Sequence, residues 1–218
     1  MYKLYAQPGW GSTIVEAQLV WYGLPFDIED VGDLFASAEA RDRLRPANPL
    51  AQVPTLILPD GQIMTESAAI TLHLADVTGR DDLVPAVREA ARPRFLRWLV
   101  FLVANVYPTF TYVDEPSRFV PGAEAQQGFQ ANVNAYKERL WRQVEHAAGA
   151  PWLLGQRFSA LDIYIGVMTH WRPRRAWFAA ECPRLHAIAA RIDGEPRLAA
   201  VRQRNFPGDL PGPGPEAD

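Results

Sequence analysis

Strand signals occur only in the first part of this chain and end before Arg88. Before that point, stretches with the alternating pattern of strands are interspersed with stretches of helical periodicity. After it, every apolar pattern repeats at three or four residues, as in an amphipathic helix. The length of 218 residues suits two small domains. The sequence therefore predicts an α/β domain followed by an all-α domain.

Residues 1–80 predict the element order β-α-β-α-β-β-α, and we take them as the first domain. Pro59-Asp60-Gly61 separates two short apolar runs and is a strong hairpin signal. We expect Ser12 to cap the first helix and Gly23 to end it. The predicted segments are strands at 3–6, 26–31, 53–58 and 62–64 and helices at 12–24, 33–45 and 65–79.

Residues 81–87 are predicted to form a linker and residues 88–205 an all-helical domain. A long helix is expected to stop before Pro108, and a second to end at Gly149 as its C-cap. Ser159 and Asp162 have the spacing of a capping box at the start of a buried helix. Residues 206–218 contain many Pro and Gly, and we expect this tail to be disordered.

The charge balance excludes several classes of partner. Lys plus Arg number 22 against 25 for Asp plus Glu, so a net charge of -3 predicts neither nucleic-acid nor anionic-membrane binding.

No apolar run approaches the length of a membrane helix, and no leader is expected. The single Cys182 cannot form an internal disulfide, and no Cys/His cluster has metal spacing. We expect a cytoplasmic protein without metal, in which Cys182 is a structural thiol.

Three motifs, in this order, carry a resemblance to a known family. They are Asn48-Pro49-Leu50-Ala51-Gln52-Val53-Pro54-Thr55-Leu56, then Glu66-Ser67-Ala68-Ala69-Ile70, then Pro151-Trp152-Leu153-Leu154-Gly155 with Ser159 to Asp162. Together with the element order, they resemble the cytosolic glutathione S-transferases over residues 1 to 205. The resemblance implies a thioredoxin-like N-terminal domain plus an all-α C-terminal domain, with glutathione as co-substrate.

The resemblance also implies a glutathione site. Val53-Pro54 would be a cis peptide that leaves the backbone of Val53 free to pair with the cysteinyl residue of glutathione. Ser67 would donate to the γ-glutamyl carboxylate at a helix N-terminus, and Glu66 would lie near the ammonium group. Gln52 could contact the glycyl end. Taken alone, Pro54 could start an edge strand, and Glu66 could be an ordinary helix cap.

Glutathione supplies its own thiol, which is mostly protonated at neutral pH, so an enzyme must stabilise the thiolate. Ser12 matches the catalytic-serine region of the serine-type classes, and Tyr5 is the competitor because the tyrosine-type classes use a phenol from the first strand. The beta class has a Cys where this chain has Gly11. Disulfide exchange through a protein cysteine is therefore not expected. Backbone amides of the loop are a third possible donor.

Aromatic residues could form the wall of a hydrophobic co-substrate pocket, or they could equally be core between the domains. These residues are Trp10, Tyr107, Phe110 and Tyr112.

Two functions stay open. The first is an enzyme that conjugates glutathione to hydrophobic electrophiles or uses it to reduce peroxides. The second is a non-catalytic binding or scaffold protein of the same fold. The resemblance also implies a homodimer.

Overall fold

The computed structural model describes residues 1–209, which divide into two compact units. Unit 1 consists of residues 1–65 and the described residues from Asp193 onward, and unit 2 consists of residues 66–192. Unit 1 contains β1 (Tyr2–Ala6), α1 (Ser12–Tyr22), β2 (Phe26–Asp30), α2 (Ala38–Leu44), β3 (Thr55–Ile57), β4 (Ile63–Met64), η3 (Pro196–Leu198), α10 (Ala199–Asn205) and η4 (Pro207–Asp209). Unit 2 contains α3 (Ser67–Thr78), α4 (Arg92–Phe101), η1 (Leu102–Val106), α5 (Pro108–Asp114), η2 (Pro116–Arg118), α6 (Ala123–Ala147), α7 (Ala160–Met168), α8 (Arg175–Glu181) and α9 (Pro183–Asp193).

The chain has a thioredoxin-like β/α N-terminal domain with a mixed four-stranded sheet, followed by a helical C-terminal domain, as predicted. The strand order is β2-β1-β3-β4. β1 pairs parallel with β2, and β3 pairs antiparallel with both β1 and β4. A parallel pair needs a crossover connection, which α1 provides. The predicted order β-α-β-α-β-β-α is confirmed.

Side chains of β1 alternate between the two faces of the sheet. Leu4 and Ala6 are buried on one face. Tyr5 lies on the other, where it packs against a buried cluster, which we call the α2 cluster, formed by Val31, Leu34, Ala40 and Leu44. The α2 cluster fixes α2, which is shorter than the predicted helix at 33–45 because Ser37 caps it by accepting the Ala40 N–H.

The start of α1 differs from the prediction. Its N-cap is Gly11, and Ser12 is its first helical residue. The Ser12 hydroxyl accepts the Gln7 N–H at 3.1 Å and donates to the Gln7 carbonyl at 3.2 Å. The prediction that Ser12 caps α1 is therefore wrong, because these bonds use its hydroxyl outside the helix. The predicted end is confirmed by Gly23, which has a left-handed φ of 68°.

The helix expected to stop before Pro108 is followed at once by a second helical segment. α4 is followed by η1, a π-helical turn, and the Tyr107 N–H donates to the Leu102 carbonyl at 2.8 Å. α5 then begins at Pro108. A proline inside a regular helix removes one hydrogen bond and its ring collides with the preceding turn. The wider π turn accommodates Pro108 at the first position of a new helical segment, so the preceding helix ends before Pro108, as predicted, and α5 follows directly.

The capping box at the start of α7 is confirmed. The buried Asp162 carboxylate accepts the Ser159 N–H and the Leu153 N–H, both at 2.8 Å. Every residue of α7 is buried. The predicted capping box of Ser159 and Asp162 therefore lies in the core of unit 2.

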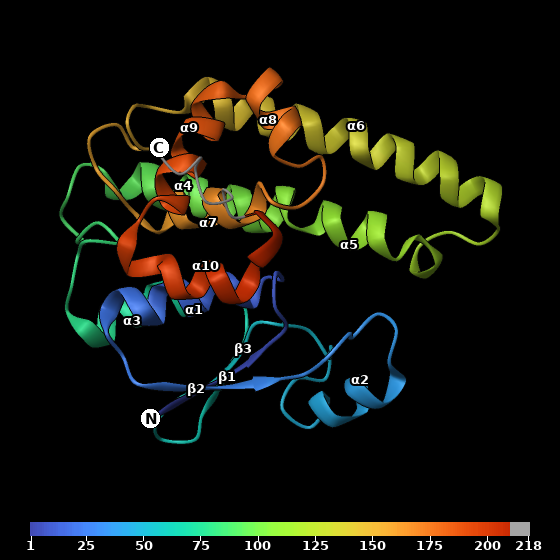
Figure 1. The fold of residues 1–218 in the computed structure, drawn as a ribbon, viewed down its shortest axis with the longest axis horizontal. Helices are drawn as coiled ribbons and strands as arrows, with labels where there is room; N and C mark the ends of the chain where they lie inside the picture. The colour runs from blue at the N-terminus through green and yellow to red at the C-terminus, as the bar shows by residue number, and fades with distance from the viewer. Residues whose placement is uncertain (210–218) are drawn as a thin grey trace, which may run out of the picture. The chain divides into compact units, whose positions relative to one another are not determined.

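Two short helices, α8 and α10, have no counterpart in the sequence prediction, and the C-cap of α6 is Ala148 instead of the expected Gly149. α10 has seven residues, of which only Val201 and Asn205 are buried. So few buried positions give no recognisable period. Figure 1 shows α10 lying along α1, with which it is in contact.

The predicted domain boundaries of 1–80, 81–87 and 88–205 stay a prediction. The compact units group α3 with unit 2 and α10 with unit 1. Of the tail predicted to be disordered, residues 207–209 form η4, and residues 210–218 lie outside the described residues. Within residues 1–209, no helix is long and apolar enough to cross a membrane.

Candidate functional site

The loop between β1 and α1 presents unpaired backbone donors. Within residues 1–209, the N–H groups of Gly11 and Ser12 have no hydrogen-bond acceptor. They open α1 at the positive end of its helix dipole, where an anion is stabilised. The Ser12 side chain is fully buried, and its hydroxyl is bonded to Gln7 on both sides. The loop thus offers two free amides and one hydroxyl that would have to release Gln7 to act on a ligand.

Tyr5, the other predicted thiolate donor, is part of a packed face. Its ring lies against the α2 cluster, and the Lys3 ammonium group lies 5.1 Å from the ring centroid. The ring of Tyr5 therefore packs between the sheet and the α2 cluster and also contacts the Lys3 ammonium group.

The segment before β3 leaves the backbone of one residue unpaired. The Val53-Pro54 peptide is cis, which confirms the prediction. In the described part of the chain, neither the N–H nor the carbonyl of Val53 makes a hydrogen bond. The preceding residues are held by the Asn48 side chain, which donates to the Gln52 carbonyl and to the Thr55 hydroxyl, both at 3.0 Å. Val53 is thus fixed in place with both main-chain groups free to pair with an extended ligand.

The neighbours of Val53 differ in exposure. Pro54 is buried, whereas the Gln52 side chain is exposed. The Gln52 carbonyl already accepts two hydrogen bonds, and the exposed side-chain amide of Gln52 is available for contacts with a ligand.

The N-terminus of α3 has the features of an anion site. Glu66 is the N-cap, with a φ of 64° that a non-glycine residue rarely adopts. Such strain tends to occur at functional positions. Among the described residues, the N–H groups of Ser67, Ala68 and Ala69 have no acceptor. Three free donors at the positive end of a 12-residue helix can bind a carboxylate.

A buried phenol lies behind Ser67. The Tyr164 hydroxyl is 3.3 Å from the Thr71 hydroxyl and also bonds the Ser67 side chain. Burial raises the pKa of Tyr164 to about 12, so its hydroxyl stays protonated. The sequence analysis did not identify Tyr164 as a neighbour of Ser67, because an aromatic residue on an apolar helix is usually a core residue. The contact with Ser67 depends on α3 and α7 meeting in unit 2.

The aromatic residues predicted for a co-substrate pocket belong to three groups of ring contacts, one in unit 1 and two in unit 2. Trp10 packs on Phe35, with ring centroids 4.6 Å apart, and on the α2 cluster. Tyr107 and Phe110 surround Trp171, whose ring centroid lies 5.4 and 5.0 Å from theirs. The third group contains Tyr112. Trp171 was not identified in the sequence because it lies beyond the periodic part of its helix.

Tyr112 borders a hollow of about 430 Å³ in unit 2. The hollow lies between α5, η2 and α6, and its walls are nearly all apolar: Tyr112, Phe119, Phe129, Asn132, Val133 and Tyr136. In Figure 1, α5 and α6 run side by side and η2 leads into the turn between them. We call it the α5–α6 hollow.

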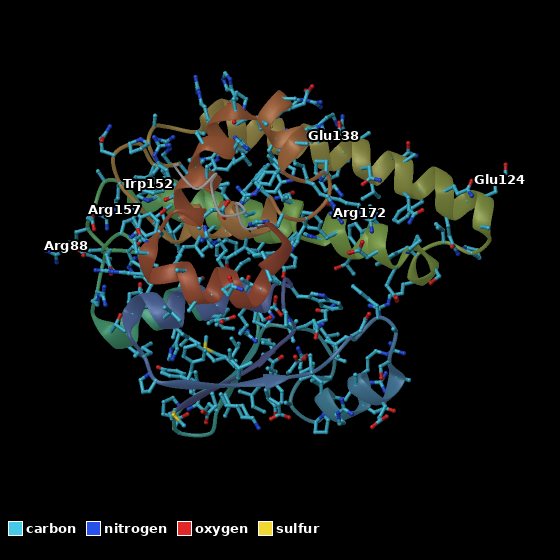
Figure 2. The ribbon with its side chains drawn as sticks, viewed as in Figure 1. Arg88, Glu124, Glu138, Trp152, Arg157 and Arg172 are labelled. Atoms are coloured by element: carbon cyan, nitrogen blue, oxygen red, sulfur yellow. The ribbon has the colours of Figure 1, made fainter. Side chains whose placement is uncertain are left out.

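A buried cation lies on the inner face of α6. Lys137 is 1% exposed, donates to the Asn134 side chain at 3.0 Å and lies 4.9 Å from the centre of the Phe110 ring. Burial lowers the pKa of Lys137 to about 8, which the nearby Asp114 only partly offsets. Asp114 is ion-paired with Arg172, whose side chain is labelled beside α5 in Figure 2. Lys137 occupies a position of the apolar repeat of α6, which was the sequence signal for a buried charge. The sequence analysis did not identify it.

Two further kinds of candidate group are a reactive cysteine and a metal-binding cluster. Burial raises the pKa of the Cys182 thiol to about 12, so this buried thiol stays protonated at neutral pH, and its structural role stays a prediction. No group of three or more His, Cys, Asp or Glu among residues 1–209 is placed to hold a metal ion.

Comparisons with known proteins agree with this geometry. Residues 12–77 match a family model for the glutathione S-transferase N-terminal domain. Over 206 residues the chain is 41% identical to the uncharacterized GST-like protein YncG of Escherichia coli (strain K12), covering 94% of this chain and 98% of that protein.

Two solved structures are also similar. A glutathione transferase homologue from Sulfitobacter with bound glutathione superposes with a TM-score of 0.80 at 22% identity, covering 93% of this chain and 97% of that one. A sphingomonad glutathione S-transferase complexed with glutathione gives 0.71 at 28% identity, covering 91% and 96%. The first likeness concerns the fold alone.

We predict that Lys137→Met removes a pH dependence of stability. The unfolded chain keeps a proton on Lys137 up to about pH 10.5, whereas the folded chain loses it near pH 8. The free energy of unfolding of the wild type should therefore rise, relative to the variant, between these two values. Chemical denaturation at pH 7 to 10 measures the difference. Arg139→Met, which removes an exposed cation from the same helix, is the control, and a difference for Lys137→Met that stays constant with pH would contradict the prediction.

Proposed function

We propose that this chain, which belongs to the glutathione S-transferase family, is an enzyme that binds glutathione, stabilises its thiolate and transfers it to a hydrophobic electrophile or uses it to reduce a peroxide. The observation that carries the proposal is the free backbone of Val53, held rigidly after the Asn48 contacts and directly before β3. Val53 is half-buried, and its unpaired main-chain groups need hydrogen-bond partners, which water or an extended ligand can supply.

The cysteinyl residue of glutathione would pair with Val53. A tripeptide in an extended conformation can exchange two main-chain hydrogen bonds with a residue that follows the geometry of a strand. Pro54 keeps the backbone turned at this point, and the exposed Gln52 amide is available to the glycyl carboxylate. The chemistry recognised here is that of a peptide backbone, which every tripeptide shares.

Selectivity for glutathione would come from the α3 terminus. The γ-glutamyl residue carries both a free carboxylate and an ammonium group. The amides of Ser67, Ala68 and Ala69, together with the Ser67 hydroxyl, match the carboxylate, and Glu66 is an exposed acid for the ammonium group. An ordinary peptide bond at this position would lack both charges.

The thiolate would be stabilised at the start of α1. The free amides of Gly11 and Ser12 and the helix dipole favour negative charge there, and the Ser12 hydroxyl can add a bond by turning its proton from Gln7 to sulfur. Tyr5 is the weaker candidate because its ring is packed on the α2 cluster.

The hydrophobic co-substrate would contact aromatic side chains. Tyr107 and Phe110 form a group with Trp171, and Trp10 and Tyr112 are further candidates. Such rings offer apolar area with little loss of rotamer freedom, which suits a range of electrophiles. The reaction would take place in the cytoplasm, where thiols stay reduced.

We predict a homodimer. The exposed rings of Tyr112, Phe119 and Tyr136 around the α5–α6 hollow form the kind of apolar patch that marks an interaction surface. Sedimentation velocity at micromolar concentration should show a dimer that Phe119→Ser weakens. Val87→Ser, at another exposed apolar position, is the control. A monomer in the wild type would contradict the prediction.

We predict that Ser67→Ala weakens glutathione binding by about 1–3 kcal/mol, the usual loss for a hydrogen bond to a charged group. The fold should survive, since Tyr164 keeps its contact with Thr71. Isothermal calorimetry measures the affinity, with the exposed Ser117→Ala as control. Unchanged affinity in a folded variant would limit Ser67 to a structural role.

We predict that Ser12→Ala raises the thiol pKa of bound glutathione by about one unit, equivalent to about 1.4 kcal/mol, while Tyr5→Phe has little effect. The thiolate absorbance of bound glutathione against pH measures both. A shift in Tyr5→Phe alone would contradict the assignment, and no shift in either would assign the role to the loop amides.

Catalytic turnover is tested separately from glutathione binding. Activity with aryl halides, peroxides and maleyl-type substrates separates an enzyme from a scaffold protein, since glutathione binding without any turnover would favour the latter.

A further inference from the structure

The side chain of Asn205, the last residue of α10, makes four hydrogen bonds. Its Oδ1 accepts the Gly9 N–H at 3.1 Å and the Thr13 hydroxyl at 2.8 Å. Its Nδ2 donates to the Glu16 carboxylate at 2.9 Å and to the Val201 carbonyl at 2.8 Å. The hydrogen-bonding capacity of the amide is therefore used completely. Its orientation is also fixed, because the Gly9 N–H can only donate and a backbone carbonyl can only accept.

The contact with the loop is close. Gly9 has a φ of 77°, and a Cβ at this position would lie 3.2 Å from the backbone carbonyl oxygen of Asn205. Only glycine combines this backbone conformation with so near an approach. The loop from β1 to α1 is therefore held directly against the end of α10.

The other half of the network is anchored by a buried ion pair. Glu16 on α1 is 3% exposed, and Arg204 donates to both of its carboxylate oxygens, at 2.9 and 2.5 Å. Such bidentate pairs restrict geometry more than single contacts do. Arg204 and Asn205, which are adjacent on α10, thus both bind Glu16, so α10 cannot slide along α1 without breaking several bonds at once.

These contacts enclose the proposed thiolate site. Asn205 binds residues on both sides of it, since Gly9 and Thr13 flank the segment that contains the Gly11 and Ser12 amides. Main-chain donors stabilise charge only if they are held in the right direction before the reaction. Small misplacements of such donors are costly.

We infer that Asn205 is a positioning residue for thiolate stabilisation, holding the loop of residues 9–13 so that its amides point at the sulfur of glutathione. The inference rests on the proposed function, but the positioning of the loop can be tested without any ligand.

The first experiment compares amide hydrogen exchange in ligand-free wild type and Asn205→Ala. The amides of residues 9–13 should exchange faster in the variant, whereas those of the β3–β4 hairpin should not change. Gln203→Ala, at an exposed position of the same helix, is the control. Equal exchange of the loop in wild type and Asn205→Ala overturns the inference.

The second experiment measures the thiol pKa of bound glutathione from its thiolate absorbance. Asn205→Ala should raise it by about half a unit to one unit, which is about 3–10-fold less thiolate below the pKa. The dissociation constant of glutathione should change less. A lower melting temperature with an unchanged thiol pKa would show a merely structural role and overturn the inference.

A milder pair of variants covers the case in which Asn205→Ala does not fold. Thr13→Val removes one donor to Oδ1 at nearly constant volume, and Thr13→Ser keeps it. The first should raise the thiol pKa and the second should restore it to the wild-type value; identical values in both overturn the inference. If the wild type itself binds no glutathione by calorimetry, the proposed function fails, and the exchange experiment still decides whether Asn205 holds the loop.

Discussion

The buried carboxylate of Glu16 ties the C-terminal helix to the first helix of unit 1. A carboxylate removed from water is strongly destabilising unless it is paired and hydrogen-bonded. Here Arg204 and Asn205 satisfy it from α10. Because α1 connects the two parallel strands and begins at the candidate thiolate site, this ion pair links the chain's C-terminal segment to the geometry of its N-terminal loop.

In each unit, the groups predicted to bind glutathione are mainly backbone groups. The amides at the starts of α1 and α3 and the main chain of Val53 are left without partners in the described chain, while side chains such as Asn48 hold them in place. Backbone donors do not titrate and have no rotamers to order. Their charge stabilisation therefore depends on the rigidity of the surrounding loops, which side-chain hydrogen bonds supply.

Unit 2 contains an irregular helical turn and a buried charge, both of which are unfavourable in a packed core. The π turn before Pro108 widens the helix immediately before Tyr107, and Lys137 carries charge into the face where α6 packs on α5. Phe110 contacts both features, since it forms edge contacts with Tyr107 and faces the Lys137 ammonium group. The Phe110 ring thus gives the buried Lys137 charge a favourable cation–π contact.

The sequence by itself determined the element order, the capping box at Ser159 and the family, because these depend on local periodicity, turn residues and short motifs. Its motifs also predicted Val53 and Ser67 as site residues, although they did not show that the main-chain groups of Val53 and the N–H of Ser67 have no partner among residues 1–209. Only the tertiary structure decided that the Ser12 hydroxyl is bonded to Gln7 and which rings the predicted pocket aromatics contact within each unit. The contact of Asn205 with Gly9 joins residues at opposite ends of the chain, and no local pattern encodes a pair so far apart. Such contacts exist only once the packing of α10 on α1 has brought the two segments together.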